Sequence, residues 1–346
     1  MPMHNFLPAR GATTTITIDS RALAGNLLGD PASRAVAVYV PRECDPAGTY
    51  PLFVFLAGFT GSGLRHLSWQ AFGESIPQRI DRLIEQGKIG PIVAAFPDGF
   101  TSLGGNQYID SIAMGRWEEF LISEMIPRVE REFPVRGARD ARAVLGKSSG
   151  GYGAIVHGLL HAETWGAVAC HSGDIGFDWV YRSDFPKTLG VLARFGGDIA
   201  AFLRALEEKP KIADDEMHAL MALAMAATYD PDASAPKGIR LPVDLRTCAL
   251  DDARWAAWLA HDPLHMVERP ECRENLERLR GLFIDCGSRD QYFVQYGARA
   301  FVSKLSAFGI AHRYEEFDDN HSGIDYRMDV SLPFLYAALT KSGRLA

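Results

Sequence analysis

Five short apolar runs, each closed by a turn, constrain the fold of this chain more than any other feature. Most of their positions are apolar in succession, without the alternation of a strand that has one wet face. Strands of this kind need helices on both sides, which is the situation in a buried parallel sheet. The pattern therefore predicts a mostly parallel central sheet. The runs are PLFVFLAG (51–58), PIVAAFPDG (91–99), ARAVLG (141–146), GAVACHSG (166–173) and GLFIDCG (281–287).

Helical patterns fill the intervals between these runs. Residues 76–87 and 116–133 both carry apolar side chains at helical spacing. Pro127 lies within the second stretch and has no backbone N–H to donate, so we expect a kink or a break there. The elements predicted for the C-terminal part are a helix over 295–308, a strand over 312–317 and a helix over 325–341.

An antiparallel pair is expected to precede the parallel strands. TTTITID (13–19) and AVAVYVP (35–41) alternate and are rich in β-branched residues, and Gly29, Asp30 and Pro31 lie between them as turn residues. Strand and helix then alternate along the chain. This order predicts an α/β fold with helices on both faces of the sheet.

One long interval interrupts the alternation. From Ser172 to Gly281 the sequence shows helical patterns but no strong strand, and no Gly/Ser/Pro-rich linker flanks it. We therefore predict one α/β domain over 1–346, with 12–175 and 275–346 as its core and a helical cap inserted at 176–270. The helical patterns of the insertion cover 186–194, 198–207, 213–227 and 251–260.

Composition and charge exclude several classes of protein. Hydrophobic residues make up 47% and charged residues 23%, as in an ordinary globular protein. The net charge of −7 and the mixed signs between Arg128 and Arg142 argue against a nucleic-acid partner. The five cysteines form no CxxC and suggest neither a zinc site nor a disulfide framework. With no secretory pattern at the N-terminus and no apolar run near the ~18 residues of a membrane helix, we expect no membrane association and a cytoplasmic location.

A G-x-S-x-G motif carries the strongest chemical signal. It spans Gly146 to Gly150, directly after the run ARAVL and before a helical stretch that begins near Tyr152. In that context the motif is typical of a nucleophile elbow, a strained turn that exposes the Ser148 hydroxyl. The amide of Ser149 would then face a developing oxyanion. A phosphate-binding loop would need a glycine where Ala141 stands, whereas a glycine-rich turn without chemistry stays an alternative.

A nucleophilic serine needs a base and an orienting acid, which follow it along the chain in the order acid, base in this architecture. Asp290 lies in the loop after the strand GLFI, and His321 lies in a polar loop after the strand HRYEEF. Asp285 is the alternative acid, although a carboxylate at a strand end more often caps a turn. Asp318 and Asp319 are too close to the histidine in sequence, because the acid must reach it from another loop.

The loop after the first buried strand, Gly58 to Gly63, is the candidate for the second oxyanion donor, through the amide of Phe59 or Thr60. It lacks the G-x-G-x-x-G of a dinucleotide site. Histidines four residues apart, as at His157 and His161, lack the glutamate of H-E-x-x-H, so we expect no metal. The residues predicted to border a substrate pocket are Thr60, Tyr108, His171, Ser172 and Trp179.

Taken together, several segments resemble the putative-esterase family of α/β-hydrolases, which includes esterase D, enterochelin esterases and feruloyl esterases. The resemblance covers roughly 20–175 and 275–330 and does not extend over the insertion. It implies Ser148 as nucleophile, Asp290 as acid, His321 as base, and the amides of Ser149 and Phe59 as oxyanion donors. The segments that carry it are YPLFVFLAGFTGSG, PDGF, RWEEFLISEMIPRVEREF, GKSSGGYGA, DCGSRD and DDNHSG.

Two positions depart from that family. Ser149 stands where many members have Met after the nucleophile, and Ala57 stands where many have His before the oxyanion glycine. Neither change removes a backbone donor, so they bear on pocket shape and substrate.

The sequence thus predicts a serine carboxylester hydrolase that forms an acyl-enzyme on a small-molecule ester and needs no cofactor. An acyltransferase with the same triad and a non-catalytic binding protein are the alternatives. A homodimer is compatible with the sequence, which does not fix the oligomeric state.

Overall fold

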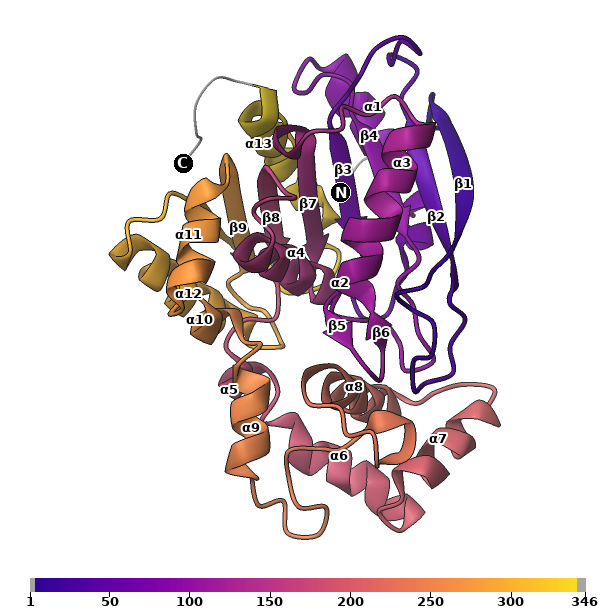
Figure 1. The fold of residues 1–346 in the computed structure, drawn as a ribbon, viewed down its shortest axis with the longest axis vertical. Coiled ribbons are helices and arrows are strands. Elements are labelled where there is room, and N and C mark those ends of the chain that lie inside the picture. Colours follow the sequence, from indigo (N-terminus) through magenta and orange to yellow (C-terminus); the bar gives the residue numbers. More distant parts are fainter. Residues whose placement is uncertain (1–3, 341–346) are drawn as a thin grey trace.

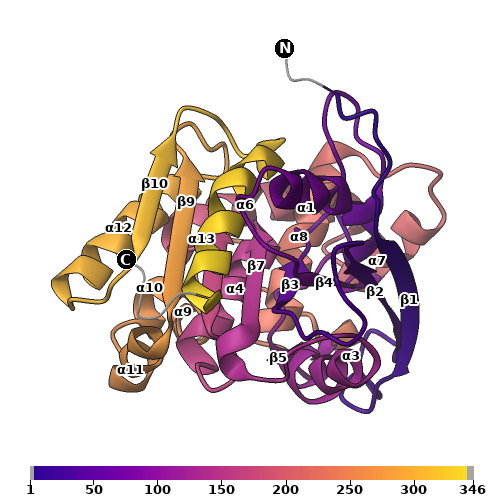
Figure 2. The ribbon, with the colours of Figure 1, turned by 90° about the horizontal axis from the view of Figure 1, so that it is seen from above.

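An eight-stranded sheet forms the centre of the protein, for which a computed structural model describes residues 4–340. The strands lie in the order β1-β2-β4-β3-β7-β8-β9-β10, and Figure 2 shows them from β10 at one side to β1 at the other. Their bounds are β1 Ala12–Asp19, β2 Ser33–Val40, β3 Leu52–Leu56, β4 Val93–Pro97, β7 Arg142–Lys147, β8 Ala167–His171, β9 Gly281–Gly287 and β10 Arg313–Phe317.

The sheet is parallel from β4 to β10, and only its first strands are antiparallel. β1 pairs antiparallel with β2 and β2 with β4, whereas all later neighbours run parallel. Every residue of β3, β4, β8 and β9 is buried, which is why their sequences lack alternation. The predicted mostly parallel sheet is confirmed. Because the strands share one direction, the loops after β3, β7, β9 and β10 meet at one edge.

Helices cover both faces of the sheet. Side chains of α1 (Ile76–Glu85) and α13 (Met328–Thr340) form one buried cluster with one set of strand side chains. The opposite set packs against α3 (Ile126–Glu132), α4 (Ser149–Leu160), α11 (Pro270–Arg278) and α12 (Val294–Ala307). Residue 341, the last of a predicted helix, lies outside the described residues. The two layers hold the carboxyl edge of the sheet rigidly from both sides.

The helix that contains Pro127 changes its hydrogen-bond pattern just before the proline, but its backbone does not break. After α2 (Trp117–Glu119) the chain forms a π-helical segment, Phe120–Met125, before α3 begins at Ile126. Pro127 lies in the first turn of α3, directly after the π-helical segment, and the junction residues Met125 and Ile126 keep right-handed helical dihedral angles.

The chain between β8 and β9 is helical, and four of its helices match the predicted patterns. Figure 1 shows α5 to α9 as a layer beyond one end of the sheet. The helices α5, α10 and α11 and a small hairpin, β5 (Asp110–Ser111) with β6 (Gly115–Arg116), were not predicted. The bounds are α5 Phe177–Val180, α6 Asp184–Leu192, α7 Ile199–Glu207, α8 Asp214–Tyr229, α9 Asp252–Leu259 and α10 Pro263–Met266.

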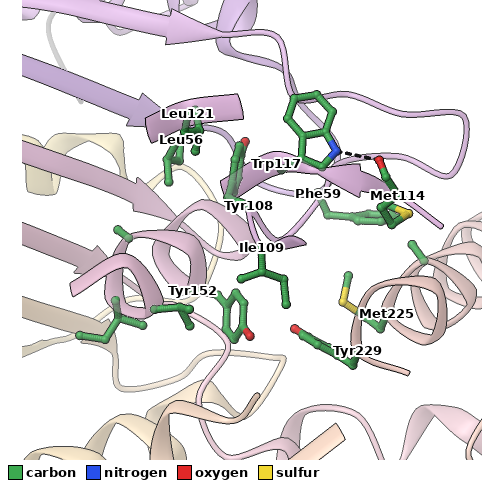
Figure 3. Close-up of a cluster of buried hydrophobic side chains, with 14 of the residues drawn as sticks. Leu56, Phe59, Tyr108, Ile109, Met114, Trp117, Leu121, Tyr152, Met225 and Tyr229 are labelled. Carbon is green, nitrogen blue, oxygen red and sulfur yellow. Dashed lines mark hydrogen bonds between the residues drawn. The ribbon is translucent and has the colours of Figure 1, made fainter. Parts of the chain in front are cut away.

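An aromatic cluster joins this helical layer to the rest of the protein. Figure 3 shows Tyr229 and Met225 of α8 facing Tyr152 of α4, with Ile109 beside them. The rings of Tyr152 and Tyr229 are 5.7 Å apart. All four side chains belong to the same buried cluster as the strands and α4. The layer is therefore packed onto the sheet assembly through side chains that water does not reach.

Candidate active site

Ser148 lies on a strained turn between a strand and a helix. β7 ends at Lys147 and α4 begins at Ser149, and Ser148 between them has φ 57° and ψ −125°. Positive φ is uncommon for a residue with a side chain. Two hydrogen bonds hold the turn, from Ser148 N to His171 O (3.0 Å) and from Tyr152 N to Ser148 O (2.8 Å). The turn has the geometry that a nucleophile elbow requires.

The glycines of the motif allow three backbone segments to meet at this turn. A Cβ atom on Gly146 would lie 2.5 Å from the carbonyl carbon of Gly150, and one on Gly150 would lie 2.1 Å from Leu56 O. Neither distance is compatible with a side chain. The first turn of α4 thus rests directly on the end of β3, which places Ser148 beside the loop that follows β3.

Asp290 and His321 are joined by a short hydrogen bond. His321 Nδ1 lies 2.7 Å from Asp290 Oδ2, and Asp290 Oδ1 accepts from Tyr292 N at 2.9 Å. Both side chains are buried, with 2% and 7% of their surface exposed. The loops that carry them are tied together, since His321 N donates to Gln291 Oε1 (3.0 Å). With Nδ1 donating to the carboxylate, Nε2 of the neutral ring is left as the proton acceptor.

A cavity of about 400 Å³ opens at the carboxyl edge of the sheet. Its wall includes Ser148 and His321, together with Phe59, Thr60 and Ser149. The predicted nucleophile, base and oxyanion donors therefore share one cavity. Asp290 is absent from the lining and binds the imidazole through Nδ1.

The loop after β3 is fixed close to Ser148. A Cβ atom on Gly58 would lie 3.4 Å from Ser148 Cβ, so the two segments are neighbours. The buried ring of Phe59 lies against Gly104, and Phe59 O accepts from Gly105 N (2.6 Å). The amide of Phe59 is thus carried by a rigid loop, and the amide of Ser149 belongs to the first turn of α4, where N–H groups lack helical acceptors.

Of the residues predicted to border the pocket, only Thr60 lies in the wall of this cavity. Tyr108 is buried behind the loop after β3 and donates its hydroxyl proton to Ala57 O (2.9 Å). Ser172 is buried with its hydroxyl near Cys286 Sγ (3.7 Å). Trp179 is 43% exposed outside the lining. The position of a residue after a strand predicts the correct edge of the sheet, but it does not predict the direction in which the side chain points.

His171 belongs to a second, buried cluster. Its Nδ1 lies 2.7 Å from Asp285 Oδ1 and its Nε2 lies 2.9 Å from Ser331 Oγ. Arg327 Nε donates to the other oxygen of Asp285 (2.8 Å) and also pairs with Glu315. Ser331, His171 and Asp285 are at most 1% exposed. Asp285, the alternative acid, is therefore bound to His171 and Arg327, away from the cavity.

Several side chains of the cavity wall were not singled out by sequence. Asp174 follows β8 and accepts from Tyr181 OH (2.8 Å) and Gln107 Nε2 (3.1 Å), and burial raises its pKa. Its place after a buried strand was the signal that could have found it. Met217 and Met221, one turn apart on α8, also line the cavity. No local pattern distinguishes such methionines from ordinary core residues.

Two further features of the described chain bear on the predictions. Within residues 4–340, no group of three or more His, Cys, Asp or Glu side chains is arranged to hold a metal ion. No helix in this range has the length and apolar character needed to cross a bilayer.

Comparison with known proteins identifies the family of this chain. The family model described as Putative esterase matches residues 31–330, which is most of the chain. The chain belongs to the putative esterase family. This membership confirms the predicted family.

One curated relative of this putative esterase is Esterase Rv1288 of Mycobacterium tuberculosis. The two are 29% identical over 141 residues, which are 40% of this chain and 28% of the relative. The match therefore covers only about a quarter of that longer protein.

Solved structures share the fold of this putative esterase. A ferulic acid esterase superimposes with a TM-score of 0.61 at 19% identity, covering 95% of this chain and 99% of that one. The S-formylglutathione hydrolase FrmB of Staphylococcus aureus gives 0.56 at 13% identity, covering 96% and 100%. FphF, a fluorophosphonate-binding serine hydrolase of the same species, gives 0.57 at 14%, with the same coverage. At these identities the similarity confirms the predicted α/β-hydrolase fold.

Proposed function

We propose that this putative esterase is a serine carboxylester hydrolase with Ser148 as nucleophile, His321 as base and Asp290 as the orienting acid. One observation carries the proposal. The serine on the strained elbow and an imidazole bound to a buried carboxylate line the same cavity. The relatives named as esterases and the fluorophosphonate-binding serine hydrolase with the same fold support it.

In this mechanism His321 Nε2 accepts the hydroxyl proton as Ser148 Oγ attacks the ester carbonyl. The amides of Phe59 and Ser149 stabilise the oxyanion of the tetrahedral intermediate. The C–O bond to the alcohol then breaks, and the alcohol leaves with the proton from His321. A water molecule, deprotonated by His321, attacks the acyl-enzyme and releases the acid. Asp290 stays ionised throughout and stabilises the imidazolium.

The test compares wild type, Ser148→Ala and Ser306→Ala on p-nitrophenyl esters from acetate to decanoate. Ser306 is an exposed serine on α12 and serves as the matched control. We expect Ser148→Ala to lower turnover by roughly 10⁴–10⁶-fold and the control to keep it. A fluorophosphonate should label Ser148, as peptide mass spectrometry would show. Near-native rates or unchanged labelling in Ser148→Ala contradict the proposal.

Adding an alcohol or a thiol to the same reaction separates hydrolysis from acyl transfer, because the transferase would yield a new ester or thioester in place of the free acid. The cytoplasmic location and the homodimer remain predictions, to be checked by fractionation and by light scattering.

A further inference from the structure

Lys147, the residue before the nucleophile, is a cation in the cavity wall. Ala143 and Leu145, the alternate residues of β7, pack in the cluster formed with α1 and α13, so Lys147 faces the same side. It lines the cavity, and burial lowers its pKa. Across residues 4–340 no carboxylate lies within 4 Å of its ammonium group. A half-buried lysine without an ion-pair partner is costly unless a ligand supplies the opposite charge.

Two more polar side chains lie in the same part of the wall. The guanidinium of Arg65 has one long contact, to Thr60 O at 3.4 Å, and no ion pair with a described carboxylate. His66 Nε2 is buried without a hydrogen-bond partner in the part of the chain that the structure covers. Burial lowers the pKa of His66 to about 4, so this ring is neutral at pH 7. We call Arg65 and Lys147 the cationic arm of the cavity, and the neutral ring of His66 lies near both.

The acidic residues near the cationic arm leave both of its cations without an ion-pair partner among the described residues. Glu74 binds Arg79 and Arg82, and both arginines also bind Asp329, so these four charges cancel. Asp325 is then the one carboxylate of the cavity lining near Lys147 and Arg65 without a cation within 4 Å, among the residues described.

A helix end also lies in this part of the wall. The N-terminus of α1, at Ser75 and Ile76, also lines the cavity and contributes its positive end. Two cations and a helix N-terminus thus lie near Asp325 and Asp290, and neither carboxylate forms an ion pair with Lys147 or Arg65 among the described residues.

Another part of the cavity wall is apolar. Val180, Met217 and Met221 line it with apolar surface. A ligand in this cavity could therefore contact both the cationic arm and apolar side chains, and Ser148 and His321 line the same cavity.

We propose that the cationic arm binds an anionic group, a carboxylate, of the ester substrate, with Lys147 as its main partner. The inference rests on the proposed function, because it assigns the substrate class of the same cavity. The carboxylate can belong to the acyl part or to the alcohol part of the ester. An anion here would give Lys147 the partner that the protein does not supply, and a charge-assisted hydrogen bond of this kind is strong.

The experiment uses two pairs of esters that differ in one negative charge. For the acyl side, p-nitrophenyl hydrogen glutarate is compared with p-nitrophenyl valerate. For the alcohol side, p-acetoxybenzoate is compared with its methyl ester. The variants are Lys147→Met, which removes the charge, and Lys147→Arg, which keeps it. Lys88→Met, at an exposed lysine outside the cavity lining, is the matched control.

In Lys147→Met we expect the ratio of kcat/KM for the anionic over the neutral ester to fall roughly 10–100-fold in at least one pair, mainly through KM. Lys147→Arg and Lys88→Met should keep the ratio of wild type. Added NaCl should lower the wild-type ratio, because salt screens the attraction. An unchanged ratio in both pairs overturns the proposal. An equal loss on charged and neutral esters also overturns it, since Lys147 would then support the elbow.

A binding measurement separates this proposal from the catalytic one. Ser148→Ala is titrated calorimetrically with p-nitrophenyl hydrogen glutarate and with p-acetoxybenzoate, and so is the double variant that also carries Lys147→Met. We expect the double variant to bind one of them at least about tenfold more weakly. Equal binding of both esters by the two proteins refutes the subsite even if no ester turns over. If instead Ser148→Ala keeps esterase activity, the nucleophile is wrong and the binding result still decides the subsite.

Discussion

Replacing Gly150 by alanine tests the packing that creates the elbow. The new Cβ atom would lie 2.1 Å from Leu56 O and 2.9 Å from Ala57 O, whereas ordinary contact begins at 3.4 Å. Both neighbours are backbone atoms at the end of β3, so no side chain can rotate away. The first turn of α4 must retreat by about 1 Å, and overpacking of this kind costs about 1–3 kcal/mol.

Gly190→Ala is the matched control, because it makes the same chemical change on a helix where a Cβ meets nothing within 4 Å. Alanine there should stabilise the protein by about 0.5–1 kcal/mol, since glycine is the poorer helix former. The two substitutions should therefore shift the midpoint of thermal unfolding, followed by circular dichroism, in opposite directions.

The same retreat of α4 moves Ser148 and Ser149 away from the loop after β3. A displacement of about 1 Å can cost on the order of 10²-fold in rate. We therefore expect Gly150→Ala to lose ester hydrolysis under conditions where it is still folded. An unfolding midpoint at or above that of wild type would refute the packing argument, whatever the activity.

Three more predictions follow from other parts of the structure. Asp290→Asn should lower kcat by roughly 10⁴-fold through the wrong imidazole tautomer, and slow fluorophosphonate labelling in parallel; labelling at the wild-type rate would speak against it. His157 is fully buried, and burial lowers its pKa to about 4. The folded protein therefore binds a proton at this ring less readily than the unfolded chain does, so the free energy of unfolding should fall by about 2 kcal/mol between pH 7 and pH 5. Urea titrations should show a smaller loss over that range in His157→Gln, and an equal loss would rule the residue out. Ser331→Ala should cost about 1–3 kcal/mol, because His171 loses a buried partner, and should leave the labelled serine unchanged in the mass spectrum; a lost label would contradict this.

The sheet was predictable because its strands are buried on both faces. A segment such as 281–287 has to be apolar throughout when helices cover both of its sides, and this leaves a signal in the sequence that needs no other part of the chain. The hairpin of β5 and β6 has strands of two residues each and leaves no such signal. The π-helical segment before Pro127 was predicted only as a kink or a break, because a proline in the sequence does not specify which hydrogen-bond pattern the helix adopts beside it.

The candidate site also contains some residues that the sequence predicts and others that it does not. Ser148 and the order of the acid and the base follow from local motifs in loops after strands. By contrast, whether His171 faces a cavity or the core depends on α13, which lies more than 150 residues away and supplies Ser331. The sequence does not single out Lys147, because a lysine between glycine and serine has no fixed meaning. Its significance comes from what surrounds it, the partners it lacks and the cavity it lines.

The buried cluster of Ser331, His171 and Asp285 has a consequence for how reactive serines are recognised. Its hydroxyl, imidazole and carboxylate are joined in the order of a hydrolytic triad, at 2.9 and 2.7 Å. A search of this structure for the arrangement of serine, histidine and aspartate alone would therefore return two candidates. Water and an ester can reach only the site in the cavity. The other cluster connects β8, β9 and α13 through buried hydrogen bonds. In this protein, access rather than arrangement separates a nucleophile from a structural serine.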